Sequence, residues 1–539
     1  MAEDKIVLDL RNVPLIALLV ILSVFFVLQL QVTIPSPITF GDEAFHTGMA
    51  RYIAKEKDYP VWITIEGTDT HRDNFAKPPM LQLLEAGFFL IFGFNELIVK
   101  FLFPFISLLT ALAIYLFMKR LYDEKVGFIA AVIFMAVPSV VTYSVTFYTE
   151  GLVTFYFTLA ALFFIYSLKT ENKKYLVLIG IFTAFAFLTE VSSVNLIIFI
   201  ALAVLYGLVK DKKIDILRYA AIFGIFILIT AGFFVRNLGL YGVPECYLPF
   251  TDKIYNKSSC KYKSLLDISE VTTFKYKYEG RTEQVGSEQS VYGMGIINYL
   301  DFAYGNIWLV TLGVFGGIII SLYRKDLTST LLLLIFLTIL PYFHFTTPRA
   351  EDAARNLLAW SPFFAIFAGV YFGRLFEFIQ DYQKYIAVVI ILIVIILSYQ
   401  NLISKTTVMK QVKQFSPAFF EACNWVKNNL PGNAVLSTVW VHRAAYSCER
   451  VTVGNHPDIF ISKDIDLIKQ TAKTIGVTHL FIQKFSLSTR PLSEVYTIDS
   501  VQFFENNTNH FKKVYENGTP IEQCIQQGGC DGTLIYEIL

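Results

Sequence analysis

The sequence predicts a polytopic α-helical membrane protein with about eleven transmembrane helices and a C-terminal extracytoplasmic α/β domain. Of its 539 residues, 55% are hydrophobic and 17% are charged, whereas a soluble domain has about 45–50% apolar and about 25% charged residues. Apolar stretches of membrane-spanning length recur through residues 1–402, and helix-like and strand-like patterns alternate after them. The net charge of +1 gives no indication of a nucleic-acid partner.

The first apolar segment covers residues 13–30, which is long enough to cross a hydrocarbon layer of about 30 Å. The bulky, proline-containing stretch after it has no small-residue cleavage site, so we expect the segment to remain as a helix. Further apolar stretches lie near residues 96–118, 125–142, 150–168, 175–190, 194–209, 215–235, 302–322, 327–346, 356–373 and 384–402.

The distribution of basic residues predicts how these helices are oriented in the cell membrane. Lys and Arg cluster in alternate short loops, whereas the loops at 143–149 and 190–194 contain none. By the positive-inside rule the N-terminus is cytoplasmic, and eleven spans place the C-terminus outside. The sequence therefore predicts a transmembrane module at 1–402, with external loops at 33–95 and 236–300, and an external domain at 403–539.

Cysteines and glycosylation sequons agree with this orientation. The cysteines all fall in the two later external segments, where an oxidising environment favours disulfides: Cys246, Cys260, Cys423, Cys448, Cys524 and Cys530. Their spacing suggests the pairs Cys246–Cys260 and Cys524–Cys530, which leaves Cys423–Cys448. The Asn-X-Ser/Thr sequons at Asn256, Asn506 and Asn517 lie on the same side.

The tail reads as a small α/β layer domain. "SPAFFEACNWVKNN" has helical spacing, with Ser416 as N-cap and Pro417 at the first position. "NAVLSTVWV" reads as a buried strand, "DIDLIKQTAKTIG" as a helix that ends at Gly476, and "VTHLFIQ" as the next strand. "FKKVYENG" and "TLIYEIL" read as closing strands.

The stretch "FGDEAFHTGMARYI" gathers ionisable groups just after the first membrane segment. Its apolar residues recur at helical spacing, which indicates an amphipathic helix along the membrane surface. Asp42 and His46 share one face of that helix, with Glu43 and Arg51 close by. Asp42 is either a helix cap in a solvated loop or a catalytic carboxylate at the boundary between apolar and polar parts of a substrate.

A lysine held beside two prolines follows, at Lys77-Pro78-Pro79, with His71 upstream. The prolines stiffen the backbone immediately before the next apolar helix. Lys77 is either a lysine that extends its amine to the interface or a ligand for an anionic head group.

Several further ionisable residues fall near the outer ends of predicted membrane helices. Acids at membrane depth usually face a partner or a water-filled cavity, although a helix N-terminus alone also favours an acid. The predicted cavity combines carboxylates with basic groups: Glu150, Glu190, Arg236, His344 and Arg355.

The order of these motifs resembles membrane glycosyltransferases of the GT-C superfold, with protein O-mannosyltransferases and the lipid A aminoarabinose transferase as similar families. "FGDEAFHTGMARYIAKEKDYP" resembles their first-loop motif, which a Lys-Pro-Pro follows some 30–40 residues later. "VRNLGLYGVP" and "ARNLLAWSPFFAIFAG" resemble two of their later segments. Asn356 and Glu190 depart from the residues common in those families.

The resemblance implies transfer of a sugar, hexosyl or pentosyl, from a polyprenyl- or dolichyl-phosphate donor. The acceptor is a hydroxyl of a glycan, protein or lipid outside the cytoplasm, and the anomeric configuration inverts. Asp42 is implied as general base, Glu43 and Glu150 as supporting acids, and Lys77 with Arg236 or Arg355 as ligands of the donor phosphate. The implied sugar or acceptor contacts are His46, Arg51, His71, Glu190 and His344.

A divalent cation, Mg²⁺, Mn²⁺ or Zn²⁺, is a further hypothesis, with Asp42, Glu150 and His46 as candidate ligands. The alternative function is a lipid or lipid-sugar transporter or flippase without transferase chemistry. Against it, the sequence shows no two-fold repeat and no matching pair of broken helices, which many transporters contain.

Overall fold

The computed structural model describes residues 13–38, 41–57, 59, 78–211, 216–241, 308–339, 355, 358–382, 396, 399–400, 403–404, 406–409, 416–454, 457–460, 462–487, 498–527 and 530–539. Contacts divide the chain into two units. The helical unit comprises Met1–Pro35, Ala76–Leu81 and Glu96–Lys410. The mixed unit comprises Ser36–Phe75, Gln82–Asn95 and Gln411–Leu539.

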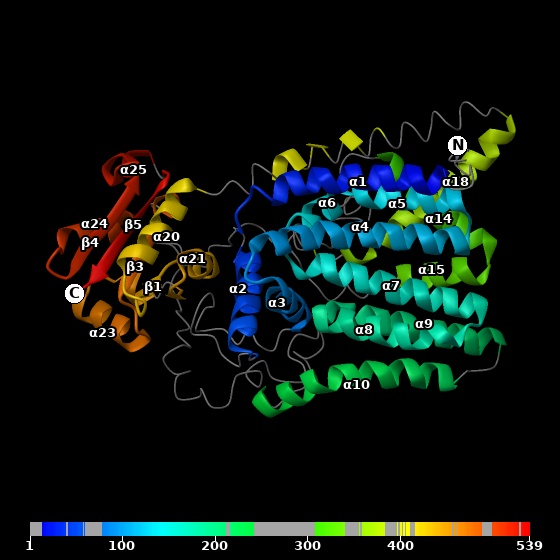
Figure 1. Ribbon diagram of the computed structural model, residues 1–539, viewed down its shortest axis with the longest axis horizontal. Helices are drawn as coiled ribbons and strands as arrows, with labels where there is room; N and C mark the ends of the chain where they lie inside the picture. Colours follow the sequence, from blue (N-terminus) through cyan, green and yellow to red (C-terminus); the bar gives the residue numbers. More distant parts are fainter. Residues whose placement is uncertain are drawn as a thin grey trace, which may run out of the picture. The chain divides into compact units, whose positions relative to one another are not determined.

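Six helical segments among the described residues are long and apolar enough to cross a membrane. Figure 1 shows the long helices of the helical unit running side by side. Four of the segments are the helices α1 (Val13–Thr33), α4 (Glu96–Leu121), α7 (Thr149–Thr170) and α10 (Ile216–Tyr241). The other two contain most of α9 (Val194–Asp211) and α18 (Ser361–Tyr382).

A bent pair, α5 (Glu124–Ala136) and α6 (Pro138–Ser144), forms a seventh span if its two halves are counted together. The halves meet at 64°, with Val137 in an extended conformation between them. Pro138 explains this bend, because proline lacks an amide hydrogen and disfavours helical geometry in the residue before it.

The described part of the helical unit also contains shorter helices: α8 (Leu176–Thr189), α14 (Trp308–Arg324) and α15 (Leu327–Leu337). Ten of the eleven predicted membrane segments overlap these helices, and most of the segment 384–402 lies outside the described residues. The prediction of a polytopic helical protein is confirmed. The orientation of its termini stays a prediction.

A glycine allows a close helix contact in this unit. A Cβ atom built at Gly317 of α14 would lie 1.9 Å from the carbonyl oxygen of Phe367 in α18. Small residues at helix crossings let backbones approach closely, which strengthens van der Waals packing in lipid, where no hydrophobic force drives association.

The mixed unit contains a five-stranded sheet. Its strands are β1 (Val435–Ser437), β2 (Val451–Val453), β3 (His479–Gln483), β4 (Phe511–Gly518) and β5 (Gly532–Ile538), in the order β2-β1-β3-β5-β4. β1 pairs in parallel with β2 and β3, and β5 pairs antiparallel with β3 and β4. The predicted α/β region at the C-terminus is therefore confirmed, whereas the domain boundary at residue 402 stays a prediction.

Among the described residues, six α-helices accompany the sheet: α20 (Pro417–Asn429), α21 (Val441–Cys448), α22 (Pro457–Phe460), α23 (Ile465–Ile475), α24 (Ile498–Asn506) and α25 (Ile521–Gln527). Ser416 caps α20 and Gly476 ends α23, both as the sequence predicts. The predicted strand at "NAVLSTVWV" is too long, because β1 ends at Ser437 and Val441 begins α21.

Two disulfides of the mixed unit confirm predicted pairs. Cys423–Cys448 ties α20 to the last residue of α21, and Cys524–Cys530 closes a short loop. Cys246 and Cys260 lie outside the described residues.

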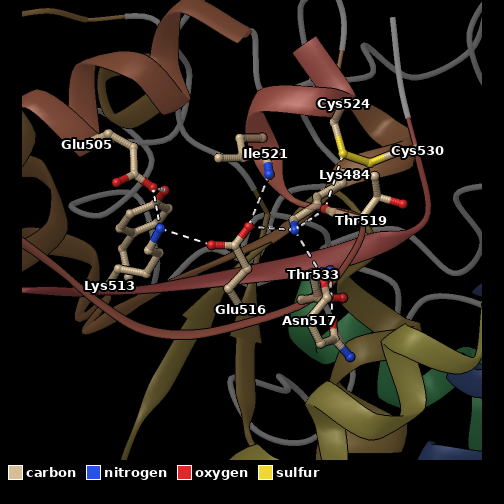
Figure 2. Close-up of polar contacts among 11 residues, drawn as sticks. Lys484, Glu505, Lys513, Glu516, Asn517, Thr519, Ile521, Cys524, Cys530 and Thr533 are labelled. Carbon is tan, nitrogen blue, oxygen red and sulfur yellow. Dashed lines mark hydrogen bonds and ion pairs between the residues drawn. A yellow bond between two sulfur atoms is a disulfide. The ribbon is translucent and has the colours of Figure 1, made fainter. Parts of the chain in front are cut away.

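A buried lysine fixes the turn after β4, as Figure 2 shows. The side chain of Lys484 is fully buried, and its amine donates to Glu516 Oε1 at 2.7 Å, the Asn517 carbonyl at 3.0 Å and the Thr519 carbonyl at 2.6 Å. These three acceptors satisfy all three ammonium protons. The Asn517 side chain donates to the Ala418 carbonyl at 2.8 Å and accepts from the Thr533 amide at 3.0 Å.

Two helices from the predicted first external loop also contribute to the mixed unit. They are α2 (Gly41–Glu56) and α3 (Met80–Phe92), of which α3 joins this unit from Gln82 onwards. α2 packs against α21, where the rings of Phe45 and His442 meet edge to face with centroids 5.1 Å apart. The helix predicted at "FGDEAFHTGMARYI" is thus held by the sheet-containing part of the chain.

Candidate functional site

The two adjacent acids predicted as catalytic lie in the first turn of α2. Asp42 and Glu43 benefit there from the positive end of the helix dipole. Glu43 is completely buried, whereas Asp42 keeps part of its surface exposed. Of the two carboxylates, Asp42 is therefore the one that a substrate can reach from solvent.

His46 follows one turn later and is directed to α3. It is buried, and its Nδ1 accepts a hydrogen bond from Gln82 Nε2 at 2.9 Å. This arrangement leaves Nε2 of the neutral imidazole to carry the proton. Gln82 fixes the ring, which restricts His46 to a narrow range of orientations beside the acids.

Glu85 of α3 is an ionisable residue that the sequence analysis did not single out. It is fully buried, and none of the described residues donates a hydrogen bond of good geometry to either carboxylate oxygen. Burial raises the pKa of Glu85 to about 8, the nearby Thr47 hydroxyl opposes that rise, and the negative charge of Glu43 adds to it. At neutral pH Glu85 is therefore mostly protonated. Gln82 and Glu85, three residues apart in an apolar helix, were the available signal.

Arg51 projects from α2 toward α21. Its guanidinium lies over the ring of Tyr446, 5.4 Å from the centroid, and Nη2 lies 3.8 Å from Glu449 Oε1. All four α2 residues singled out from sequence thus belong to one helix that contacts both α3 and α21.

In the helical unit, Glu150 and Arg355 form an ion pair. Glu150 lies in the first turn of α7 and is almost fully buried, and Arg355 Nε donates to its Oε1. Arg355 also covers the ring of Tyr148 at 4.7 Å. Thr149 Oγ1 donates to Glu190 Oε2 at 3.2 Å. The predicted acidic residues Glu150 and Glu190 and the predicted basic residue Arg355 therefore gather at this point.

The remaining predicted site residues are one arginine in α10 and three residues that the structure does not describe. Arg236 lies in α10, where Nη1 donates to Asn237 Oδ1 at 3.3 Å. Lys77, His71 and His344 lie outside the described residues. The set of ligands for a donor phosphate therefore stays a prediction.

The candidate metal ligands predicted from sequence are Asp42, Glu150 and His46. Within the described ranges, no group of three or more His, Cys, Asp or Glu side chains is arranged to hold a metal ion. Arg355 already supplies positive charge to Glu150, which weakens the need for a cation at that acid. The residues described do not fit a resident metal, and we derive no step through one.

Comparisons with known proteins agree with this architecture. Residues 76–233 match the family model described as dolichyl-phosphate-mannose-protein mannosyltransferase. The oligosaccharyltransferase of Archaeoglobus fulgidus, in a structure with Zn and sulfate, matches with a TM-score of 0.67 and 11% identity, over 96% of this chain and 88% of that one. The chain has the GT-C fold. The resemblance inferred from sequence is confirmed.

Two further GT-C structures contain lipid phosphates. The Archaeoglobus fulgidus oligosaccharyltransferase AglB, in complex with an inhibitory peptide and a dolichol-phosphate, has a TM-score of 0.65 and 12% identity, over 95% of this chain and 80% of that one. ArnT from Cupriavidus metallidurans, bound to undecaprenyl phosphate, has a TM-score of 0.58 and 12% identity, over 96% and 97%. No curated protein sequence matches the chain significantly.

Proposed function

We propose that this GT-C chain transfers a sugar from a polyprenyl- or dolichyl-phosphate donor to a hydroxyl acceptor, with inversion, on the extracytoplasmic side of the membrane. The observation that carries the proposal is the pair of acids in the first turn of α2, in a chain whose residues 76–233 match a mannosyltransferase family model. The lipid phosphates bound by two structural neighbours support this class of donor.

Asp42 acts as the general base in this proposal. The reaction needs a group that removes the proton from the acceptor hydroxyl as it attacks the sugar, and a partly exposed carboxylate suits this task. Glu43 is buried and positions the helix turn rather than touching the acceptor. Glu85 stays protonated below a pH of about 8, so it adds no negative charge beside Glu43.

Positive charge stabilises the departing lipid phosphate. Lys77 precedes Pro78 and Pro79, and α3 begins at Met80, so the backbone next to this lysine is stiff. Lys77 and Arg236 therefore hold the phosphate in this proposal. Arg355 contributes through its pair with Glu150, which orients both groups.

The test is transfer of radiolabelled sugar from a synthetic polyprenyl-phosphate donor by purified full-length protein. Asp42→Asn is expected to lower turnover by about 10²–10⁴-fold, the usual contribution of a general base. Glu56→Gln, an exposed acid at the end of the same helix, is the matched control and should retain activity.

The outcomes separate the two parts of the proposal. Donor binding by wild type without any turnover would reject the transferase and favour the lipid transporter or flippase. Full turnover by Asp42→Asn would reject only the assignment of the base.

A further inference from the structure

A pocket of about 310 Å³ opens in the mixed unit, between α2 and α21. Arg51 and Lys55 line it from α2, Tyr446 and Glu449 line it from α21 and the residue after it, and Phe94 closes one side. Gly48 and Ala445 also line it, and neither residue is large enough to fill the space. The volume is at the lower end of the range of about 300–1,000 Å³ for small-molecule pockets.

The charges that line the pocket do not cancel. Glu449 Oε1 accepts a hydrogen bond from Lys427 Nζ at 3.0 Å, and it lies further, at 3.8 Å, from Arg51 Nη2. Lys427 therefore balances most of the Glu449 charge. Lys55 Nζ lies 3.6 Å from Glu56 Oε1, and because this ion pair is exposed, Glu56 offsets the charge of Lys55 only weakly. The pocket presents two cations and one carboxylate, with an excess of positive charge.

The pocket is held in shape before any ligand binds. The Arg51 guanidinium rests on the buried ring of Tyr446, which limits its rotamers. The disulfide Cys423–Cys448 fixes the end of α21 directly beside Glu449. Less conformational entropy is lost on binding when the ligating groups are already ordered.

We propose that this pocket binds an acidic sugar, a hexuronate, within a glycan acceptor. The ligand carboxylate pairs with Arg51 and Lys55, an apolar face of the sugar ring lies on the exposed ring of Phe94, and Glu449 accepts hydrogen bonds from sugar hydroxyls. Inorganic phosphate and a lipid head-group phosphate offer the negative charge but fewer hydroxyl donors for Glu449. This combination of two cations and one acid favours a sugar acid.

The place of the pocket on α2 defines its role, and this step rests on the proposed transferase function. Arg51 follows Asp42 by nine residues on the same helix, which corresponds to about 13 Å at 1.5 Å per residue. The bound hexuronate is therefore a neighbouring unit of the acceptor, and the hydroxyl that reacts belongs to another unit. The pocket selects the acceptor instead of performing the chemistry.

Binding is tested by calorimetric titration of purified full-length protein with methyl β-D-glucuronide and with neutral methyl β-D-glucoside. The glucuronide should bind at least about tenfold more tightly, because a hydrogen bond to a charged group contributes about 1.5–3 kcal/mol. Arg51→Met and Lys55→Met should each weaken glucuronide binding by about tenfold or more. Lys473→Met, an exposed lysine on α23, is the matched control and should leave it unchanged.

Three results would overturn the proposal. They are equal affinities for the two glycosides, unchanged glucuronide binding by Arg51→Met, and competition by inorganic phosphate or by vesicles of anionic lipid at concentrations that match the glucuronide. Arg51→Lys keeps the charge and should retain part of the binding, which separates lost recognition from lost folding.

Binding is measured without donor or transfer, so its failure is distinct from failure of the transferase. Asp42→Asn should bind the glucuronide as wild type does. Glucuronide binding by a protein without any transferase activity would leave the pocket as a sugar-acid site and reject only its role for an acceptor.

Discussion

At the scale of single residues, Glu85 makes the stability of the mixed unit depend on pH. The folded protein keeps a proton on Glu85 up to a pKa of about 8, whereas the unfolded chain releases it near the ordinary glutamate pKa of 4.5. Between these pH values the folded state binds more protons than the unfolded state, so stability falls as pH rises. Within this window the free energy of unfolding falls by about 1.4 kcal/mol for each pH unit, and it falls no further above a pH of about 8.

Glu85→Gln should remove this dependence, because a neutral amide has no proton to lose. The variant should be more stable than wild type at pH 8, by on the order of a few kcal/mol, and the difference should shrink toward pH 4.5. Thermal unfolding in detergent across this range measures it. Glu56→Gln serves as control, and a parallel pH profile for wild type and Glu85→Gln would contradict the assignment.

The role of Glu85 could not be predicted from the sequence, unlike the residues of α2. Asp42, Glu43, His46 and Arg51 were recognised because they are dense and adjacent in the chain. Glu85 lies in an apolar helix, and its importance comes from the packing of α3 against α2, a contact between residues about 40 positions apart. Periodicity within one helix carries no information about such a partner.

At the scale of elements, the helices were largely predictable and the short strands were not. Long apolar runs identify membrane helices by length alone. The strand expected over 433–441 contains β1 and the start of α21, and β2 with its three residues was not predicted. A short, fully buried parallel strand has no alternating pattern, so it cannot be distinguished from a buried helix by periodicity.

The two disulfides should differ in their effect. Cys423–Cys448 spans 25 residues and Cys524–Cys530 spans 6. Loop-closure entropy then predicts that replacing the first disulfide by two serines lowers the free energy of unfolding by about 3–4 kcal/mol, and replacing the second lowers it by about 2 kcal/mol. Only the first holds α21 beside the pocket, so only its loss should also weaken glucuronide binding. Equal effects of both replacements on binding would contradict this role of α21.

The contact between α14 and α18 depends on a glycine. Gly317→Ala would place a Cβ 1.9 Å from the Phe367 carbonyl oxygen, so the two helices must separate. We expect a loss on the order of 1–3 kcal/mol, the usual cost of overpacking. The matched control is Gly224→Ala in α10, where a Cβ has no atom within 4 Å and helix propensity favours alanine. The melting temperatures of the two variants are measured in detergent. Equal values would contradict a tight crossing of α14 and α18.

At the scale of the whole molecule, composition established the membrane class and the order of motifs established the GT-C resemblance. The grouping of α2 and most of α3 with the C-terminal sheet was not predicted, because hydropathy assigns segments to membrane or loop but does not pair one loop with another. The proposed acceptor pocket follows from that grouping, since its lining residues on α2 and on α21 are about 390 residues apart in sequence.

The hydrogen bonds of Asn517 determine where the folded protein can carry a glycan. Its side-chain amide nitrogen donates to the Ala418 carbonyl at 2.8 Å and to Glu421 Oε2 at 3.1 Å, and its oxygen accepts from the Thr533 amide, so both ends of the half-buried side chain are engaged beside the Lys484 network that Figure 2 shows. Asn506, at the exposed end of α24, and Thr508 after it are both accessible. Of the two sequons in the described mixed unit, only Asn506 can accept a sugar without breaking the fold.

The test is expression of the Asn256→Gln variant in a host that N-glycosylates proteins, followed by mass spectrometry of glycopeptides. We expect one glycan. Adding Asn506→Gln should remove this glycan, whereas adding Asn517→Gln should leave it in place. Modification of Asn517 would contradict the closed turn. A protein without sugar at either site would contradict the predicted external location of its C-terminus. The hydrogen bonds of one side-chain amide thus link the packing of a turn to the side of the membrane on which it folds.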